Sequence, residues 1–355
     1  MCIADGKPSD FGMELMDIDI VGAYSNYGNL VRPLNVSKGN LQHWVLGKIV
    51  IPYNQSNTNS TWLDNIGEYE AFISGYDDDG NEQLHKCNDE AVRFLVPTYF
   101  KKEVLDKYYN NPQEYNVDGF TLKGRHFTLK NDNNVEDYVP VFIHYLTEIP
   151  HKEQLHWKQY NFMPNNAHIS KTYHNTMVLG NWAEEPETVD LYFKSKYRNF
   201  NKMWEEKFGW PLYLPLTGTD IHLFTSLHLP TKNNIKSFSE QMLTIVKLTI
   251  DALNESKLSE GLNKIEKERG LGKFERFLGD LELPMPDMFE FLRYLQDLRS
   301  GMIAHRFSNS NKYVKKAIKF FGLNEENYRE VAKDIFVKSI FTLNTLEKHL
   351  LAEPK

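Results

Sequence analysis

The chain has 355 residues, 41% of them hydrophobic and 25% charged, which is enough apolar material for one large domain or two of ordinary size. No apolar run approaches the roughly 18 residues of a membrane-spanning helix, so that class is excluded. The start, MCIADGKPSD, lacks a charged segment followed by an apolar stretch, so we expect no signal peptide and a cytoplasmic location. Cys2 and Cys87 are too few for a disulfide framework or a four-cysteine zinc site.

The net charge of -7 is unevenly distributed along the chain. Residues 232–355 carry 21 basic and 18 acidic side chains, whereas residues 1–231 carry 20 and 30. The isoelectric point near 6.0 gives no support to nucleic-acid binding by the whole chain. A basic surface confined to the C-terminal part remains open.

Residues 1–216 are expected to form an α+β domain for recognition or sensing. A turn is predicted at Asp77-Asp78-Asp79-Gly80. Helices are predicted at 100–109, with Thr98 as N-cap, and at 187–207, ending before Gly209. Short apolar and β-branched runs between turn residues predict strands at 45–51, 69–74, 91–96, 120–129 and 139–146.

Prolines interrupt the chain around residue 216, so we expect a linker at 217–234 and an all-α bundle at 235–355. A broad apolar surface predicts a largely buried helix at 235–254. Another helix is predicted to begin near Asp287, and a last one near Asn324, with Glu325 and Glu326 in its first turn. In the helix predicted to begin near Asp287, apolar residues recur at helical spacing: Met288, Phe291, Leu295 and Leu298.

Most sequence signatures of enzymes are missing from the chain. It has no GxxxxGK[ST] loop, no strand followed by GxGxxG, no HExxH and no GxSxG. The acidic turn at Asp77 does not match a calcium loop, because Glu82 stands where glycine is needed and Asn88 where glutamate is needed. We therefore expect neither a cofactor nor a bound metal.

The most informative segment is Asp297-Leu298-Arg299-Ser300-Gly301-Met302-Ile303-Ala304-His305-Arg306, which closes the helix that begins near Asp287. This segment resembles the motif of the HEPN superfamily, whose helical bundles carry Arg, a polar residue, a few variable positions and His. Arg299, Ser300 and His305 match it as R-x5-H, with Ser300 where Asn, Asp or His is commoner. The resemblance covers about residues 232–351.

The chemistry of RNA cleavage gives these residue types a reason to occur together. A His can transfer a proton to or from the 2′-hydroxyl or the leaving 5′-oxygen near neutral pH, and a guanidinium can hold phosphate oxygens as charge develops. The resemblance implies a metal-independent endoribonuclease, of the kind found among bacterial toxins and antiphage defence proteins. It also implies a homodimer in which two motifs share one cleft.

A less specific interpretation also stays open for this segment. Arg299 could cap the last carbonyls of its helix while His305 is a buried residue with a satisfied ring. The helical bundle would then be a scaffold for a non-enzymatic dimeric interaction or sensor protein. In either case the N-terminal domain could bind a protein partner or an antitoxin.

A second feature points to phosphate binding without the family resemblance. Lys312, Lys315, Lys316 and Lys319 fall at i, i+3, i+4 and i+7, which places four ammonium groups on one helical face. Their mutual repulsion costs a few tenths of a kcal/mol per pair unless an anion compensates. Together with Arg306, this lysine face is a candidate RNA-binding surface, and a plain solvated face is the alternative.

The N-terminal part resembles segments of uncharacterised bacterial proteins that have the same kind of C-terminal helical part. The resemblance lies at residues 95–109, 156–161 and 206–212. No activity comes with it. The aromatic residues there could form a recognition pocket, and core packing explains them equally well.

Overall fold

The computed structural model describes residues 2–5, 44–47, 68–89, 95–182, 185–304 and 312–351. For residues 2–5, 44–47, 300 and 302–304 it describes the backbone alone. The chain divides into two compact units, residues 1–64 and 65–355. Each unit is described by itself.

The first unit contains two described strands, β1 (Cys2–Asp5) and β2 (Trp44–Gly47), which pair in an antiparallel ladder. Strand β2 covers the first part of the strand predicted at 45–51. Residues 48–51 lie outside the described part of the chain.

The second unit begins with a β-hairpin of β3 (Ala71–Tyr76) and β4 (Glu82–Lys86). Its turn is closed by Asp77, whose Oδ1 accepts the backbone N–H groups of Asp79 at 3.0 Å and Asn81 at 2.7 Å. Gly80 takes a φ of +80°, a left-handed conformation that glycine adopts without strain. The predicted strand at 69–74 and the predicted turn at 77–80 are confirmed.

Two small antiparallel sheets follow, and one of them forms the centre of this region. The central sheet has the order β10-β5-β9, and the other has the order β6-β7-β8. Strands β5 and β9 bury Phe100 and Val139 completely. The strands of the two sheets are β5 (Pro97–Lys101), β6 (Asn116–Val117), β7 (Thr121–Lys123), β8 (Thr128–Lys130), β9 (Tyr138–Phe142) and β10 (Asn161–Phe162).

The helix predicted at 100–109 begins later than expected. Thr98, the predicted N-cap, lies in β5 opposite Val141, and its hydroxyl donates to the carbonyl oxygen of Ile73 at 2.7 Å. Pairing with a strand far along the chain therefore overrides the local capping signal. A 3₁₀ turn at Lys102–Leu105 and the short helix α2 (Asp106–Tyr109) make up the rest of the segment.

Two further strand predictions are also corrected. The strand predicted at 120–129 is two strands, β7 and β8, because the chain reverses where the N–H of Gly124 donates to the carbonyl oxygen of Phe127 at 2.9 Å. The strand predicted at 139–146 ends at Phe142, and 3₁₀ turns continue from Ile143. Residues 91–94 of the strand predicted at 91–96 lie outside the described part.

Helix α3 (His151–Lys158) fixes the core of the sheet region. Its Trp157 packs edge-on against Phe100 with ring centroids 4.8 Å apart, and its indole N–H donates to the hydroxyl of Tyr108 at 2.8 Å. Helix α4 (Lys171–Tyr173) follows and continues as a π-helical turn to Val178. The central sheet, α2 and α3 therefore share one apolar core.

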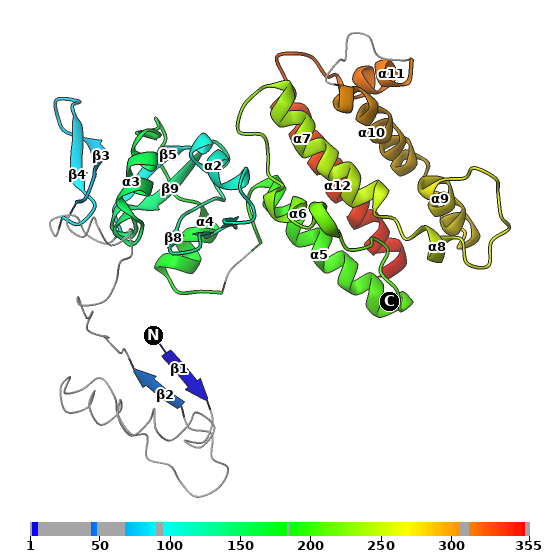
Figure 1. The fold of residues 1–355 in the computed structure, drawn as a ribbon, viewed down its shortest axis with the longest axis horizontal. Coiled ribbons are helices and arrows are strands. Elements are labelled where there is room, and N and C mark those ends of the chain that lie inside the picture. Colours follow the sequence, from blue (N-terminus) through cyan, green and yellow to red (C-terminus); the bar gives the residue numbers. More distant parts are fainter. Residues whose placement is uncertain are drawn as a thin grey trace, which may run out of the picture. The chain divides into compact units, whose positions relative to one another are not determined.

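Helices make up the remainder of the second unit (Figure 1). Helix α12 packs against α5 and α7, and α10 packs against α7, α9 and α11. A π-helical turn at Lys247–Asp251 extends α7. The helices are α5 (Val189–Phe208), α6 (Leu223–Ser226), α7 (Ile235–Val246), α8 (Glu255–Leu258), α9 (Gly270–Asp280), α10 (Pro286–Ala304), α11 (Lys312–Phe321) and α12 (Tyr328–Leu346).

Helix α5 belongs to the helical core, although the predicted boundary at residue 216 places it in the N-terminal domain. Its Phe193, Phe200 and Trp204 are fully buried, and Phe193 meets Phe336 of α12 with ring centroids 5.7 Å apart. Helix α5 ends at Phe208, and Leu212 and Tyr213, which lie between the prolines at 211 and 215, belong to the same core as α5. The predicted order, a mixed α and β region followed by helices, is confirmed at that level.

The helices expected after residue 235 are present, with one changed start. The predicted helix at 235–254 is confirmed to Asp251, and the helix predicted to begin near Asp287 is α10. The last helix begins at Tyr328 rather than after Asn324. The side chain of Asn324 instead accepts the N–H of Glu326 at 2.8 Å, which holds residues 324–326 in a turn after α11 ends.

Candidate functional site

Arg299 lies near the end of α10, five residues before its last residue, Ala304. Leu295 and Leu298 face the core and are fully buried, which turns the next position toward the surface. The Arg299 side chain is 36% exposed, and its Nη1 donates to Oδ1 of Asp251 at 2.7 Å. Asp251 ends the π-helical turn after α7 and is 33% exposed. The guanidinium is therefore accessible and already paired with a carboxylate.

The other residues of the motif are described only in part or lie outside the described residues. The backbone of Ser300 continues α10, and its side chain is not described. His305 and Arg306 lie outside the described residues, in the segment 305–311 between α10 and α11. Arg299 is thus the one predicted catalytic side chain whose surroundings are defined.

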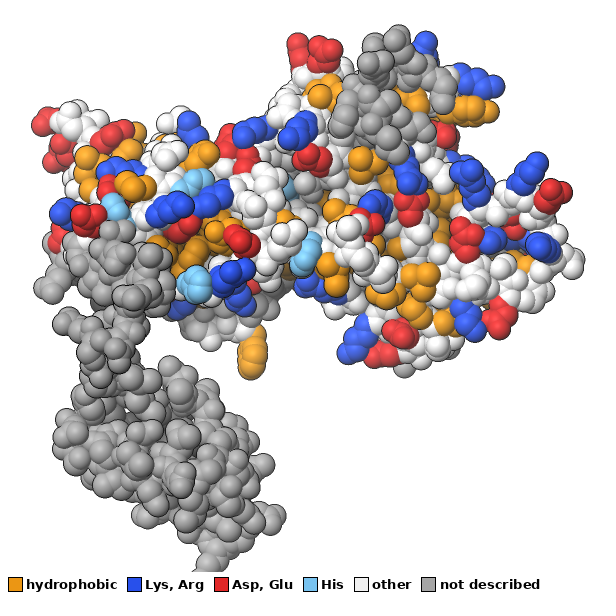
Figure 2. All heavy atoms as spheres, in the orientation of Figure 1, with side chains coloured by type: hydrophobic (Ala, Val, Ile, Leu, Met, Phe, Trp, Pro, Cys, Tyr) orange, Lys and Arg blue, Asp and Glu red, His pale blue; other side chains and the backbone are white. Residues whose placement is uncertain are grey.

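The lysine face predicted from helical spacing is exposed. Helix α11 presents Lys312, Lys315, Lys316 and Lys319 to solvent, while Val314, Ala317 and Phe321 are buried. In Figure 2, basic side chains stand out beside the grey residues where Figure 1 places α11. Four like charges on ten residues make a local positive potential, and such a surface attracts phosphate.

Aromatic rings fix α11 against α10 as a helical hairpin. Tyr294 and Phe320 stack with ring centroids 4.3 Å apart, and Phe291 meets Phe321 edge-on at 6.2 Å. Burial raises the pKa of the Asp297 carboxyl on α10. The positive charge of Lys316 on α11 acts to lower it, so it partly offsets the effect of burial. Asp297 precedes Arg299 by two residues, so the lysine face and the motif arginine belong to one hairpin.

The described side chains of this hairpin that can bind a phosphate are its cations. Among the described residues, no group of three or more His, Cys, Asp or Glu side chains is arranged to hold a metal ion. Cys87 is buried, and burial raises the pKa of its thiol to about 11, so it carries no thiolate at neutral pH. Guanidinium and ammonium groups at the hairpin can bind and stabilise phosphate charge.

A buried cluster of charges lies elsewhere, and sequence reasoning missed it. Lys194 donates to the carbonyl oxygens of Thr225 and Leu227, each at 2.9 Å, and burial lowers its pKa to about 8. Burial acts to raise the pKa of Asp190, but the charge of Lys102 and a hydrogen bond from the N–H of Leu229 lower it overall. Asp190 and Lys194 lie four residues apart on α5, but their hydrogen bonds to Thr225, Leu227 and Leu229 reach a segment far along the chain, which no local pattern indicates.

His228 belongs to the same cluster and joins the sheet region to the helices. Its ring stacks on Tyr109 with centroids 3.8 Å apart and an interplanar angle of 6°. Its Nδ1 is 2.6 Å from the carbonyl oxygen of Ser226, so Nδ1 carries the proton. Burial lowers the pKa of His228 to about 4. These contacts give the cluster a structural role in holding the two regions together.

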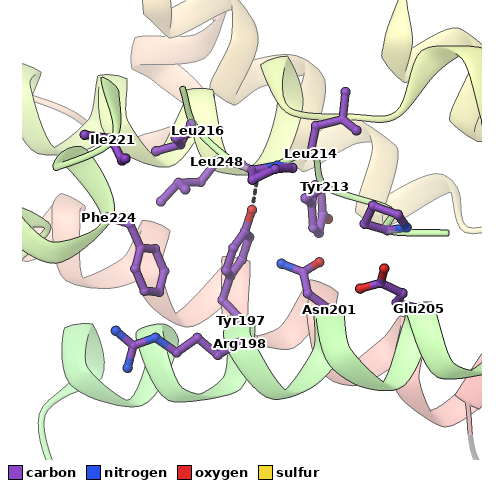
Figure 3. Close-up of a pocket in the computed structure, with 12 residues that line it drawn as sticks. Tyr197, Arg198, Asn201, Glu205, Tyr213, Leu214, Leu216, Ile221, Phe224 and Leu248 are labelled. Atoms are coloured by element: carbon purple, nitrogen blue, oxygen red, sulfur yellow. Dashed lines mark hydrogen bonds between the residues drawn. The ribbon is translucent and has the colours of Figure 1, made fainter. Parts of the chain in front are cut away.

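A cavity beside α5 is the second feature that the sequence did not reveal (Figure 3). Its polar side comes from α5 and its apolar side from the segment after Pro211, which sequence analysis treated partly as a linker. The aromatic residues at helical spacing on α5 could have indicated a core face, and they gave no sign of an open cavity.

Comparison of the chain with protein-family models, with curated proteins and with solved structures finds no match. No helix among the described residues is long and apolar enough to cross a membrane.

Proposed function

We propose that this protein is a metal-independent endoribonuclease of the HEPN type, with its RNA-binding site on the α10–α11 hairpin. The observation that supports this most is the combination of an accessible Arg299 with the exposed lysine face of α11 on one hairpin. His305 lies in the short segment that joins the same two helices. Residues required for binding and for chemistry are therefore close together in the sequence.

Each residue type has a definite role in this proposal. The lysine face holds the RNA backbone by charge, and Arg299 stabilises the phosphate as negative charge develops on it. His305 transfers the proton between the 2′-hydroxyl and the leaving 5′-oxygen. Asp251 must give up its ion pair when phosphate binds Arg299. The 2′-oxygen forms a bond to phosphorus as the bond from phosphorus to the 5′-oxygen breaks, which gives a 2′,3′-cyclic phosphate and a protonated 5′-hydroxyl.

The proposal extends to the assembly. Two protomers bring their motifs into a shared cleft, which makes the homodimer the active unit. A toxin or antiphage effector of this design works in the cytoplasm. The sheet region would then receive a trigger or an antitoxin protein.

The deciding experiment is cleavage of a structured RNA by the purified protein in excess EDTA. We expect cleavage by the unaltered chain and a loss of 10²-fold or more in His305→Ala and Arg299→Ala, the order of magnitude of general acid–base and electrostatic contributions. Arg293→Ala is the matched control, because Arg293 lies on the same helix and pairs with Glu275. A requirement for magnesium, or full activity in His305→Ala, would contradict the proposal.

A second candidate, a non-enzymatic dimeric scaffold, is favoured by one observation. The Arg299 guanidinium has a carboxylate partner within the chain and needs no phosphate to be satisfied. A scaffold predicts that Arg299→Ala changes the stability of the helices and leaves RNA unaffected. The EDTA assay and the unfolding transition of the same variant separate the two candidates.

A further inference from the structure

Helix α12 exposes apolar side chains on the side that faces away from the core. Its other side packs against α5 and α7, where Ile335, Phe336 and Leu343 are buried (Figure 1). Val337 and Phe341, four residues apart, are 49% and 69% exposed. Contact of apolar side chains with water is unfavourable, so a molecule that covers both of them would be bound by the hydrophobic effect.

Charged side chains of opposite sign lie at the two ends of this apolar pair. Glu330 lies seven residues before Val337, and Lys348 lies seven residues after Phe341, in the π-helical turn that continues α12. Spacings of seven, four and seven residues return to one face of a helix, so these four residues form one stripe, the α12 stripe. Glu330 and Lys348 are exposed, and neither forms an ion pair among the described residues.

The order of the side chains makes the α12 stripe complementary to itself. Position 339 lies midway between Glu330 and Lys348 and also midway between Val337 and Phe341. Two antiparallel copies of α12, related by a two-fold axis at position 339, therefore place Glu330 beside Lys348 of the second copy. The same arrangement places Val337 beside Phe341 of the second copy. A parallel pair would instead bring like charges together, which is unfavourable.

The charges of the α12 stripe favour a second copy over a nucleic acid. Glu330 repels a phosphate backbone, and Lys348 alone offers the stripe a single cation. A second copy supplies an opposite charge for each end and an apolar surface for the centre. The stripe therefore carries its own complement.

We propose that the α12 stripe pairs with the α12 stripe of a second copy of the chain in antiparallel orientation. The Arg299 motif lies on α10, which packs against α7, α9 and α11, so this contact is separate from the proposed cleft. The inference goes beyond the proposed function and does not depend on RNA cleavage. Two apolar side chains from each chain bury little area, so we expect a dissociation constant on the order of 100 µM.

Sedimentation equilibrium of the full chain between about 10 and about 500 µM measures this association. We expect the average mass to rise by up to about twofold over this range, in addition to any association at the motif. Phe341→Glu places a carboxylate at the centre of the contact and should weaken the association at least about tenfold, which removes the rise. Leu155→Glu makes the same change at an exposed position on α3 and should leave the rise unchanged.

Exchange of the two charges tests the antiparallel orientation. Glu330→Lys and Lys348→Glu should each weaken the association about fivefold, because like charges then meet twice in each pair of chains. The double variant should recover the original association, since opposite charges meet again. A mass that stays constant over this concentration range would overturn the proposal. Equal behaviour of Phe341→Glu and Leu155→Glu, or no recovery in the double variant, would overturn it as well.

Discussion

The ion pair between Arg299 and Asp251 determines how much positive charge the motif offers to a phosphate. Both side chains are about one-third exposed, so the pair contributes at most about 1 kcal/mol to stability. An exchange of Asp251 for phosphate is therefore energetically accessible. Only the arginine of this pair was predicted from the sequence, because Asp251 comes from a different helix and no spacing rule connects the two.

Asp251→Asn is expected to strengthen RNA binding about threefold to fivefold at low salt. The substitution frees the Arg299 guanidinium and removes a negative charge that repels phosphate. Fluorescence anisotropy with a labelled single-stranded RNA measures the change. Glu290→Gln, an exposed position on α10, makes the same change of charge farther from the motif. Equal effects of the two substitutions would show that only net charge matters.

His228 is expected to make the chain less stable as the pH falls. The folded state lowers the pKa of His228 from about 6.5 to about 4, so the unfolded chain binds a proton that the folded chain excludes. This contribution is complete above pH 6.5 and is lost as the pH falls toward 4, by at most about 3 kcal/mol. The charges of Asp190, Lys194 and Asp106 act on the same ring.

The measurement is urea unfolding at a series of pH values from 7.5 to 4.5, compared with His228→Phe. Phenylalanine keeps a flat ring against Tyr109 and cannot titrate, so its unfolding free energy should fall less steeply below pH 6.5. Carboxylates that do not act on the His228 ring contribute equally to both proteins and cancel in the comparison. Parallel curves for the two proteins would exclude a buried neutral His228.

At the scale of helices and strands, the lysine face of α11 makes the clearest prediction. Lys315→Ala with Lys316→Ala should flatten the log-log salt dependence of RNA binding by about 0.7 for each phosphate that the variant no longer neutralises. The helix should tolerate the change, because both positions are exposed and alanine is the better helix former. Salt titrations followed by anisotropy give the slope.

The control for the lysine face is Lys236→Ala with Lys257→Ala. It removes the same charge from two exposed lysines on α7 and α8. If both double variants bind RNA with the same slope as the unaltered chain, the lysine face is a solvated surface and the nuclease proposal loses this support.

Helices were predictable where their signal is local. Phe238 and Met242 on α7, or Leu295 and Leu298 on α10, recur at helical spacing and are buried as the period requires. Strand β5 was missed because its partners, Val141 and Asn161, lie in strands far along the chain. The cavity beside α5 was missed for the same reason, since its two walls meet only in the folded chain.

At the scale of the whole second unit, polar contacts tie the sheet region to the helices. Lys232 pairs with Asp106 at 2.7 Å, and Arg329 of α12 pairs with Asp137 at 2.9 Å. The stack of His228 on Tyr109 adds an apolar contact to these pairs. A ligand or partner at the sheet region would therefore act on the same body that carries α12. These contacts connect the sheet region physically to the helices, as a sensing role of the sheet region requires.

The last prediction concerns the assembly of two chains. One chain carries one Arg299 and one His305, and the proposed cleft requires motifs from two protomers, so we expect a homodimer formed through the helices. Light scattering at tens of micromolar, above typical dimer dissociation constants, should give twice the mass of the chain. Arg299→Ala and His305→Ala are each expected to be inactive, and mixing them should restore part of the activity, because a mixed dimer keeps one arginine and one histidine in the shared cleft. A monomer at this concentration, or no recovery on mixing after subunit exchange, would show that the cleft is not shared.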